Sequence, residues 1–364
     1  MGKPSRTRVR LGLALSAALV AGSLALAQTP AQPPPPAVPR APAQAILQVR
    51  GNIYRASNGN WWSLFVVTTD GIIVVDPINP AHAAWLKAQL AERYPGVPVR
   101  YVIYSHSHWD HIEGGAVFAD TAHFVAQEGV LRNMDGRYPH MPGDMIDRHN
   151  DGVLELDDIM IPTNAHPGIC GMSEAWFKSH DRNGDGKMTP AELFADVVKP
   201  DIVYSDRMTL RLGGETLQLI FPGKNHADDG TVVYFPAEKV VFSTDFPADA
   251  LVGKSMRSLP SACGAFDEHP ISEWIKSYRT IEALDFDILA QGHGSVLFTK
   301  QDVTEGREYF EYLRDQVSAA MAKGMSLDEM RRTLMLEKYK DWAQYDRLRV
   351  MNIEAAYNNL RTYK

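Results

Sequence analysis

Cysteine is scarce in this chain. Only Cys170 and Cys263 occur among its 364 residues, too few for the disulfide framework of small secreted folds. The two could still pair with each other in an oxidising compartment. Stability must therefore come mainly from a packed apolar core.

Positive charge is also in short supply. Lys and Arg total 37 against 44 Asp and Glu, for a net charge of −7, and the chain has no basic runs. Removing the basic residues of the first ten positions makes the charge more negative still. An acidic surface of this kind argues against nucleic acid as a partner and favours a small-molecule substrate.

Long apolar segments are limited to one near the start. Basic residues up to Arg10 precede an apolar stretch from Leu11 that closes on Ala25-Leu26-Ala27, the order of a secretory signal peptide. The stretch is short for a membrane span, although an uncleaved anchor is the alternative. The sequence predicts a signal peptide at 1–27, a linker rich in Pro and Ala at 28–44, and a periplasmic or secreted protein without stable membrane insertion after cleavage.

The remaining chain alternates strand and helix patterns. Strand-like runs at 46–49, 62–67 and 72–75 precede a helical period at 80–93 and a strand at 99–104. A second half repeats the pattern, with strands at 207–221, 231–235 and 238–245, a helix at 271–284 and a strand at 286–289. This order predicts a layered α/β fold. The tail at 302–362 is helical by composition, and we expect it to pack on the core, with a dimer face as the alternative.

A cluster of histidines follows the strand at 99–104. Residues 105–111 read Ser-His-Ser-His-Trp-Asp-His, so His106, His108, Asp110 and His111 offer imidazole nitrogens and a carboxylate suited to zinc, iron or manganese. His106 and His108 point the same way in an extended segment. A turn could direct Asp110 and His111 towards a second ion.

Two ions need more ligands than this cluster supplies. His226, Asp245 and His293 each follow an apolar strand and precede loop residues, where a rigid sheet presents functional side chains. Each alone could be an ordinary turn or hydrogen-bonding residue. Their coincidence with the histidine cluster favours a shared metal site.

These residues, in this order after Asp76, resemble the metallo-β-lactamase superfamily. The resemblance implies an α/β fold, a four-layer αββα sandwich. The predicted domains are a hydrolase domain at 45–300, interrupted by an EF-hand-like helical insertion at 138–200, and a helical C-terminal extension at 301–364. The resemblance also implies that His106, His108 and His226 hold one ion and that Asp110, His111 and His293 hold the other, with Asp245 bridging. Asp76 would hold a ligand loop or imidazole in place.

The predicted chemistry is hydrolysis with two divalent transition metals, zinc being the favoured pair. A water shared between them loses a proton near neutral pH, and Asp110 could orient this nucleophile and later protonate the leaving group. No Ser or Cys is required as nucleophile. Esters, thioesters, lactones or related bonds are the expected substrates.

Three alternatives stay open. Zinc-dependent hydrolysis of β-lactams is one, and a mononuclear iron redox enzyme of the same fold is another. The third is a calcium-dependent binding module with a vestigial pocket. The metal content of the purified protein would distinguish them.

The insertion carries a second type of metal motif. Residues 181–192 fit an EF-hand calcium loop, whose predicted ligands are Asp181, Asn183, Asp185, Lys187, Thr189 and Glu192. A poorer copy starts at Asp147 and would use Asp147, His149, Asp151, Val153 and Asp158. Leu154 and Met188 hold equivalent positions, where paired EF-hands form a short strand bridge. His149, His166 and His180 are assigned no catalytic role.

Tryptophans accompany the predicted site. Trp109 lies inside the histidine cluster, and Trp61 and Trp62 lie on a connection expected near the cleft. They could form an apolar lip for a hydrophobic acyl group, but packing in the core or on a strand is the favoured interpretation.

Overall fold

The computed structural model describes Gly2 and residues 44–134, 147, 149, 151–159, 174–247, 269–294, 296–343 and 345–363. Apart from Gly2, the predicted signal peptide lies outside these residues, as do nearly all of the linker, His166, Cys170 and Cys263. The chain divides into two units, 1–38 and 39–364, and the elements below all belong to the second. Within the described part, we find no helix that combines the length and apolar character needed to cross a bilayer.

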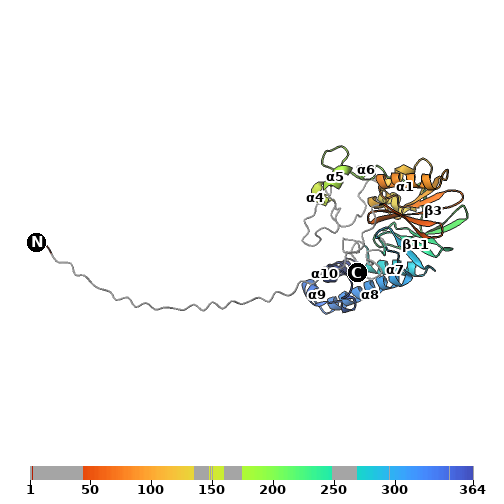
Figure 1. Cartoon of the computed structure of the whole chain (residues 1–364). Coiled ribbons are helices and arrows are strands. Elements are labelled where there is room, and N and C mark those ends of the chain that lie inside the picture. The colour runs from red at the N-terminus through yellow and green to blue at the C-terminus, as the bar shows by residue number, and fades with distance from the viewer. Residues whose placement is uncertain are drawn as a thin grey trace. The chain divides into compact units, whose positions relative to one another are not determined.

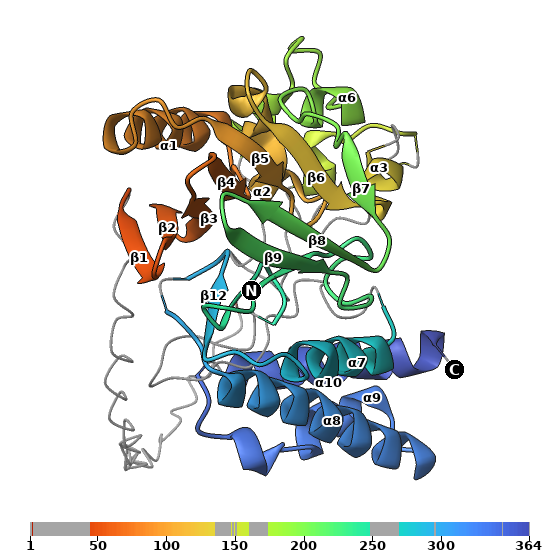
Figure 2. The same cartoon turned by 90° about the vertical axis from the view of Figure 1, so that its right-hand side faces the viewer.

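Two sheets form the centre of the second unit (Figures 1 and 2). The seven-stranded sheet has its strands in sequence order: β1 (Ile46–Arg50), β2 (Ile53–Asn58), β3 (Trp61–Val67), β4 (Ile72–Val75), β5 (Val99–Ile103), β6 (His123–Gln127) and β7 (Ile202–Tyr204). The five-stranded sheet has the order β12 (Ile288–Gln291), β11 (Val240–Ser243), β10 (Val232–Phe235), β9 (Glu215–Ile220) and β8 (Arg207–Leu212).

Helices connect and cover the sheets. The first half contains α1 (Pro80–Arg93), α2 (Trp109–Ile112), the 3-10 helix η1 (Glu113–Phe118) and α3 (Gly129–Asn133). The insertion contributes α4 (Leu156–Ile159), α5 (Glu174–His180) and α6 (Pro190–Leu193). The second half contains α7 (Ile271–Glu282), α8 (Lys300–Ala322), α9 (Leu327–Thr333), η3 (Glu337–Tyr339) and α10 (Tyr345–Thr362).

Side-chain alternation along the strands builds four layers. In β3, Leu64 and Val66 join the core between the two sheets, whereas Phe65 joins the core under α1. In β10, Val233 faces the same inter-sheet core, and Val232 faces α7 and α8. Successive strand residues point to opposite faces, so strands covered on both faces are continuously apolar. Figure 2 shows α1 on one side of the paired sheets and α7 to α10 on the other.

Local signals explain where the main helices begin and end. Asn79 accepts a hydrogen bond from the His82 backbone and Pro80 follows it, which starts α1. Thr299 and Asp302 form a capping box at the start of α8. That helix ends just before Gly324, whose φ of 74° suits a residue without a Cβ.

Most predicted elements are confirmed. The predicted strand at 207–221 is instead a hairpin of β8 and β9, because Gly213 and Gly214 have positive φ and turn the chain. Strands β2, β6 and β7 were not predicted. The C-terminal region is helical, as expected, and its apolar side chains join those of α7 and the five-stranded sheet in one core.

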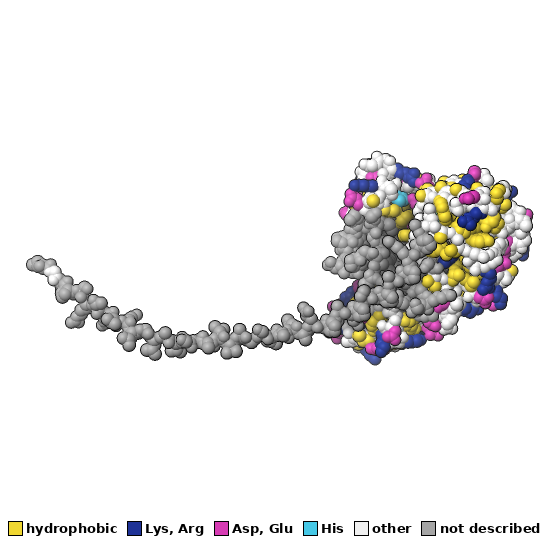
Figure 3. All heavy atoms as spheres, in the orientation of Figure 1, with side chains coloured by type: hydrophobic (Ala, Val, Ile, Leu, Met, Phe, Trp, Pro, Cys, Tyr) yellow, Lys and Arg dark blue, Asp and Glu magenta, His cyan; other side chains and the backbone are white. Residues whose placement is uncertain are grey.

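Charged side chains of both signs are interspersed on the face drawn in Figure 3. Lys87 and Asp120 form one exposed ion pair, with 2.7 Å between Nζ and Oδ1. Such exposed ion pairs contribute little to stability.

Candidate metal centre

The carboxyl ends of four strands bring the candidate site together. Asp76 follows β4, His106 follows β5, Asp245 follows β11 and His293 follows β12. Because β4 pairs in parallel with β5, and β11 with β12, their carboxyl ends meet at one edge of each sheet. Asp76 and Asp245 have φ of 56° and 57°, a left-handed conformation that Asp tolerates better than most residues and that is enriched at functional sites.

The seven predicted ligands lie in two adjacent groups. In each group the candidate ligand atoms lie within 4.8 Å of one another. The first group is His106, His108, His226 and Asp245, and the second is Asp110, His111 and His293. Residues separated by up to 187 positions in the chain therefore converge, as the sequence required for a shared site.

Asp245 connects the two groups. Its Oδ2 lies 3.4 Å from His106 Nε2 and 3.4 Å from His226 Nε2 in the first group. The same oxygen lies 3.1 Å from His111 Nε2, and Asp245 Oδ1 lies 2.8 Å from His293 Nε2. One carboxylate thus reaches imidazoles on both sides.

Asp110 and His111 are consecutive residues of the short helix α2. Asp110 Oδ2 lies 3.2 Å from His111 Nε2 and 3.8 Å from His293 Nε2. The same oxygen accepts a hydrogen bond of 3.0 Å from Trp61 Nε1. Trp61, the first residue of β3, therefore fixes the orientation of this carboxylate.

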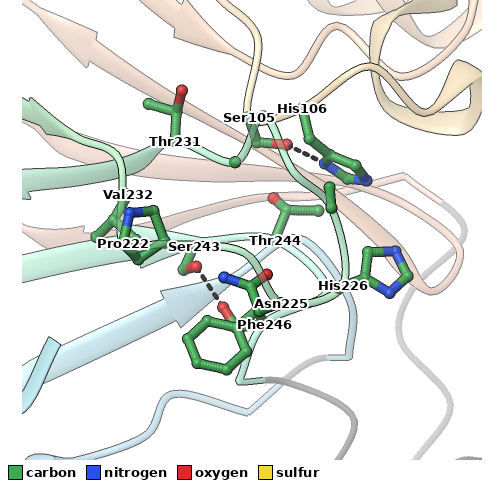
Figure 4. A pocket seen from close by; sticks show the side chains of 12 residues that line it. Ser105, His106, Pro222, Asn225, His226, Thr231, Val232, Ser243, Thr244 and Phe246 are labelled. Atoms are coloured by element: carbon green, nitrogen blue, oxygen red, sulfur yellow. Dashed lines mark hydrogen bonds between the residues drawn. The ribbon is translucent and has the colours of Figure 1, made fainter. Parts of the chain in front are cut away.

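The donor set fits divalent metal ions such as zinc. Ser105 Oγ lies 2.9 Å from His106 Nδ1 (Figure 4), leaving Nε2 directed at the first group. This Nε2 is buried and has no hydrogen-bond partner among the described residues, an unfavourable state for a neutral imidazole unless an ion completes it. Nitrogen and carboxylate ligands of this kind match zinc chemistry.

The pKa values of His108 and His111 shift in opposite directions because their neighbours carry different charges. Burial and the neighbouring His106 and His226 rings lower the pKa of His108 well below its usual value. Burial also disfavours the charged form of His111, but the carboxylates of Asp110 and Asp245 outweigh it and raise the His111 pKa. His108 is therefore held neutral, the form that binds metals.

Asp76 supports the site from below. It is fully buried, and its Oδ1 accepts a 2.8 Å hydrogen bond from the Ser105 backbone, while Thr244 Oγ1 donates to Oδ2 at 2.7 Å. Burial raises the pKa of this carboxyl group, against the lowering effect of His111. Asp76 thus ties the loop before His106 to the residue before Asp245.

Close packing at the strand ends leaves little room for change. A Cβ at Gly292 would collide with the side chain of Thr244. Gly292 immediately precedes His293 at the end of β12, and Thr244 immediately follows Ser243 at the end of β11. Figure 4 also shows the Ser243 hydroxyl directed at the Phe246 carbonyl.

Several supporting residues were not predicted from the sequence. Asp229 is fully buried and accepts hydrogen bonds from the Ser107 backbone, at 3.4 Å, and from Asn133, at 2.9 Å. Arg55 lies over the ring of Trp62 and points its Nη1 at the Gln291 carbonyl, 3.4 Å away. Only the nearness of Asp229 to His226 in the sequence could have suggested a supporting role for Asp229, and no sequence signal pointed to Arg55.

A cleft of about 530 Å³ opens beside Asp110. Its walls include Trp61, Trp109 and Trp176. Trp61 is 36% exposed, whereas Trp62 is fully buried. Of the two neighbouring tryptophans, only Trp61 borders the cleft, and Trp62 packs in the interior.

The insertion forms two similar loops joined by a bridge. Leu154 and Met188 form the predicted antiparallel pair, with N–H···O distances of 2.9 and 2.8 Å. Gly152 and Gly186, at the sixth position of each loop, have φ of 86° and 83°.

The first and last side chains of each loop are folded inward. Asp181 accepts hydrogen bonds from the backbones of Gly184 and Gly186, both at 2.9 Å. Glu192 accepts one of 2.9 Å from the Thr189 backbone. In the other loop, Asp158 accepts a matching bond of 2.8 Å from the Glu155 backbone.

Comparison with known proteins places these features in a family. A family model described as the metallo-beta-lactamase superfamily matches residues 58–293. The 2,4-dinitroanisole O-demethylase subunit alpha of Nocardioides sp. (strain JS1661) is 23% identical over 253 residues, covering 69% of this chain and 58% of the relative. The linear primary-alkylsulfatase of Pseudomonas sp. (strain ATCC 19151) is 22% identical over 274 residues, covering 72% of this chain and 47% of the relative.

A solved structure shows the same fold. The stereoselective inverting sec-alkylsulfatase Pisa1 from Pseudomonas sp. superimposes with a TM-score of 0.59 at 16% identity, covering 88% of this chain and 51% of that one. The chain spans about half the length of the curated relatives it matches.

Proposed function

The chain belongs to the metallo-beta-lactamase superfamily, and on this premise we propose that it is a hydrolase of ester-type bonds that uses two divalent metal ions. The observation that carries the proposal is the position of Asp245 between the two groups of imidazoles. Its Oδ2 lies 3.4 Å from His106 Nε2 and 3.1 Å from His111 Nε2. A carboxylate with nitrogen ligands on both sides suits a bridging role between two ions.

The residues of each group would hold one ion. The first ion would be bound by nitrogens of His106, His108 and His226. The second ion would be bound by Asp110, His111 and His293, and Asp245 would be shared by both ions. When bound, such a pair of ions lowers the pKa of water near neutrality and polarises the oxygen of the bond to be cleaved.

Asp110 is the proposed proton carrier. Burial opposes its ionisation, but His111 and His293 outweigh that effect and hold the Asp110 pKa well below its usual range. Its Oδ2 therefore begins as a proton acceptor, oriented by the 3.0 Å hydrogen bond from Trp61 Nε1. It would take a proton from the attacking water and return it to the leaving group.

The substrate class follows from the ligand set and the relatives. The named relatives include alkylsulfatases and an O-demethylase. We therefore propose carboxylic esters, thioesters, lactones or sulfate esters as substrates. Hydrolysis of β-lactams remains the first alternative to test.

Metal content distinguishes this proposal from a one-iron redox enzyme and from a calcium-binding module. We expect about two zinc ions per chain after purification and zinc loading, measured by elemental mass spectrometry. One iron per chain, or calcium without a transition metal, would contradict the proposal.

Substitution of the bridging carboxylate gives the direct test. Asp245→Ala should lower turnover on whichever substrate of the ester, thioester, lactone, sulfate-ester and β-lactam panel responds, by at least about a thousandfold. Asp120→Ala, which removes an exposed carboxylate paired with Lys87, is the matched control and should leave turnover unchanged. Turnover near that of the wild type in Asp245→Ala would refute the bridging role.

We also propose that the loop at 181–192 binds calcium through Asp181, Asn183, Asp185, Lys187, Thr189 and Glu192. The bridge to Leu154 and the inward side chains of Asp181 and Glu192 support it. The loop at 147–158 is the weaker candidate, because His149 occupies an oxygen-ligand position and Asp158 is shorter than Glu. Calorimetric titration with calcium should show binding that Asp181→Asn weakens.

Finally, we propose that the chain is exported and that cleavage follows Ala27. The basic start and the small residues at the end of the apolar segment support this. N-terminal sequencing of the mature protein should begin at Gln28, and a mature chain that still begins at Met1 would contradict it.

A further inference from the structure

The cleft beside Asp110 has an aromatic lining. Trp61, Trp109 and Trp176 all border its volume of about 530 Å³. Pockets of this size hold small organic groups, and aromatic walls favour apolar ones.

The rings are held in fixed relations to one another. The centroids of Trp109 and Trp176 lie 4.7 Å apart, and those of Trp176 and His180 lie 4.4 Å apart. On the opposite side, Trp61 donates its indole hydrogen to Asp110. An apolar group in this cleft would lie directly beside the proposed metal centre.

On the side of the cleft lined by Trp176, which we call the Trp176 wall, the charged side chains of His180 and Glu113 pair with each other. His180 Nε2 lies 2.6 Å from Glu113 Oε1, and both residues are buried. His180 Nδ1 lies 2.9 Å from the Trp176 carbonyl. Because these polar atoms are already partnered, the wall presents aromatic surface to an occupant.

Trp176 and His180 in the Trp176 wall belong to the insertion. Helix α5, which carries Trp176 and His180, leads directly into the loop at 181–192, and the Asp181 backbone donates to the Phe177 carbonyl at 2.8 Å. Among the described residues of the insertion, four buried side chains form a core with Trp109 and Trp176 packed against it: Leu154, Phe177, Met188 and Leu193. Because metal binding is coupled to folding, an ion bound in the adjoining loop would help to order this core.

We propose that the cleft binds the apolar part of the substrate, a ring or short alkyl chain, and that calcium in the loop at 181–192 holds the Trp176 wall in place. The inference rests on the hydrolase and calcium proposals above. It makes Trp176 a residue that determines specificity, and it makes calcium a regulator of apolar substrate binding.

Binding of neutral probes tests the cleft independently of turnover. Benzyl alcohol and hexan-1-ol would be titrated by calorimetry into the zinc-loaded, calcium-loaded protein. Trp176→Ala should raise their Kd about tenfold and Trp176→Leu about threefold, because each removes apolar contact area. Trp85→Ala, a change at another partly buried tryptophan, carried by α1, is the matched control and should leave Kd unchanged.

Two results would overturn the binding site. One is an unchanged Kd in both Trp176 variants while calcium binding persists. The other is an equal weakening in Trp85→Ala. If Trp176→Ala does not fold, Trp176→Leu decides, because Leu keeps an apolar side chain on the core of the insertion.

Calcium dependence is the second arm. Protein prepared without calcium should bind both probes about tenfold more weakly, and millimolar calcium should restore affinity while magnesium does not. Calcium that binds calorimetrically but leaves probe affinity unchanged would overturn the coupling. A failed hydrolase proposal would appear instead as intact probe binding without turnover, and a failed calcium proposal as no heat of calcium binding.

Discussion

The transition-metal centre and the loop at 181–192 use similar side chains in opposite ways. The centre gathers seven residues from the ends of β5, β11 and β12, from the short helix α2 and from the loop before β10, and most of them are buried. The loop takes its candidate ligands from twelve consecutive residues on an exposed part of the chain. A dispersed site depends on the complete sandwich, whereas a contiguous one depends mainly on local turns.

Loss of a ligand from the centre should have the largest effect and should spare the loop. His226→Ala removes one of three imidazoles proposed for the first ion, so zinc content should fall from about two towards one per chain, with turnover reduced at least about a hundredfold. Calcium binding should not change. Elemental mass spectrometry and calorimetry on the same sample measure both, and a parallel loss of calcium would show that the two regions are not independent.

Acid should weaken the sandwich through His82, a buried histidine of α1. Burial lowers its pKa to about 4. Its Nε2 lies 3.0 Å from Ser63 Oγ, and its Nδ1 has no partner among the described residues to accept an added proton. Because the pKa in the unfolded chain is near 6.5, the unfolded state takes up the proton first as pH falls.

The His82 contribution should therefore be complete above pH 6.5 and be lost between pH 6.5 and about 4, by about 3 kcal/mol in total. Urea unfolding at several pH values, compared with His82→Gln, measures it. The difference between the two proteins should change across this window. A constant difference would show that His82 does not titrate differently in the folded protein.

Asp76→Asn should weaken zinc binding without changing a ligand, because Asp76 holds the residues next to His106 and Asp245 in place. The amide keeps the shape of Asp76, but its nitrogen cannot accept one of the bonds now made by Ser105 and Thr244. Zinc affinity should fall about ten- to hundredfold. Competition with a zinc-binding dye measures it, and Asp201→Asn, at an exposed carboxylate paired with His123, is the control.

The smallest effect on catalysis should come from the loop itself. Glu192→Gln keeps the helix cap of α6 but removes a charged candidate ligand, so calcium affinity should fall at least about tenfold. Zinc content should remain at two, and turnover of a small substrate such as methyl acetate should change less than about twofold. Loss of a zinc ion from Glu192→Gln would show that the loop and the transition-metal centre are not independent.

Sequence patterns predicted much of the fold for a physical reason. Strands such as β4 are buried on both faces, so every residue is apolar, and α1 carries both a cap and a helical period. Strand β2 was missed because Arg55 and Ser57 are buried polar residues within it. Their burial depends on partners such as the carbonyl of Gln291, which no local pattern contains.

The candidate ligands were also easier to predict than their surroundings. Histidine is rare enough, at 12 of 364 residues, that its spacing carries information. The contact of Trp61 with Asp110 and the place of Trp176 in the cleft depend on how separate elements meet. Tryptophan is common in cores, so its identity alone could not separate Trp61 from the buried Trp62.

The pairing of Trp61 with His293 has a consequence for the order of assembly. Trp61 forms an isolated bridge with His293, and the Trp62 backbone donates to Gly292 at 2.7 Å. The final imidazole thus docks against a strand made more than two hundred residues earlier. A growing chain cannot complete the second group until residue 293 has emerged, so the second zinc ion should be acquired late. The loop at 181–192 has all its candidate ligands much sooner.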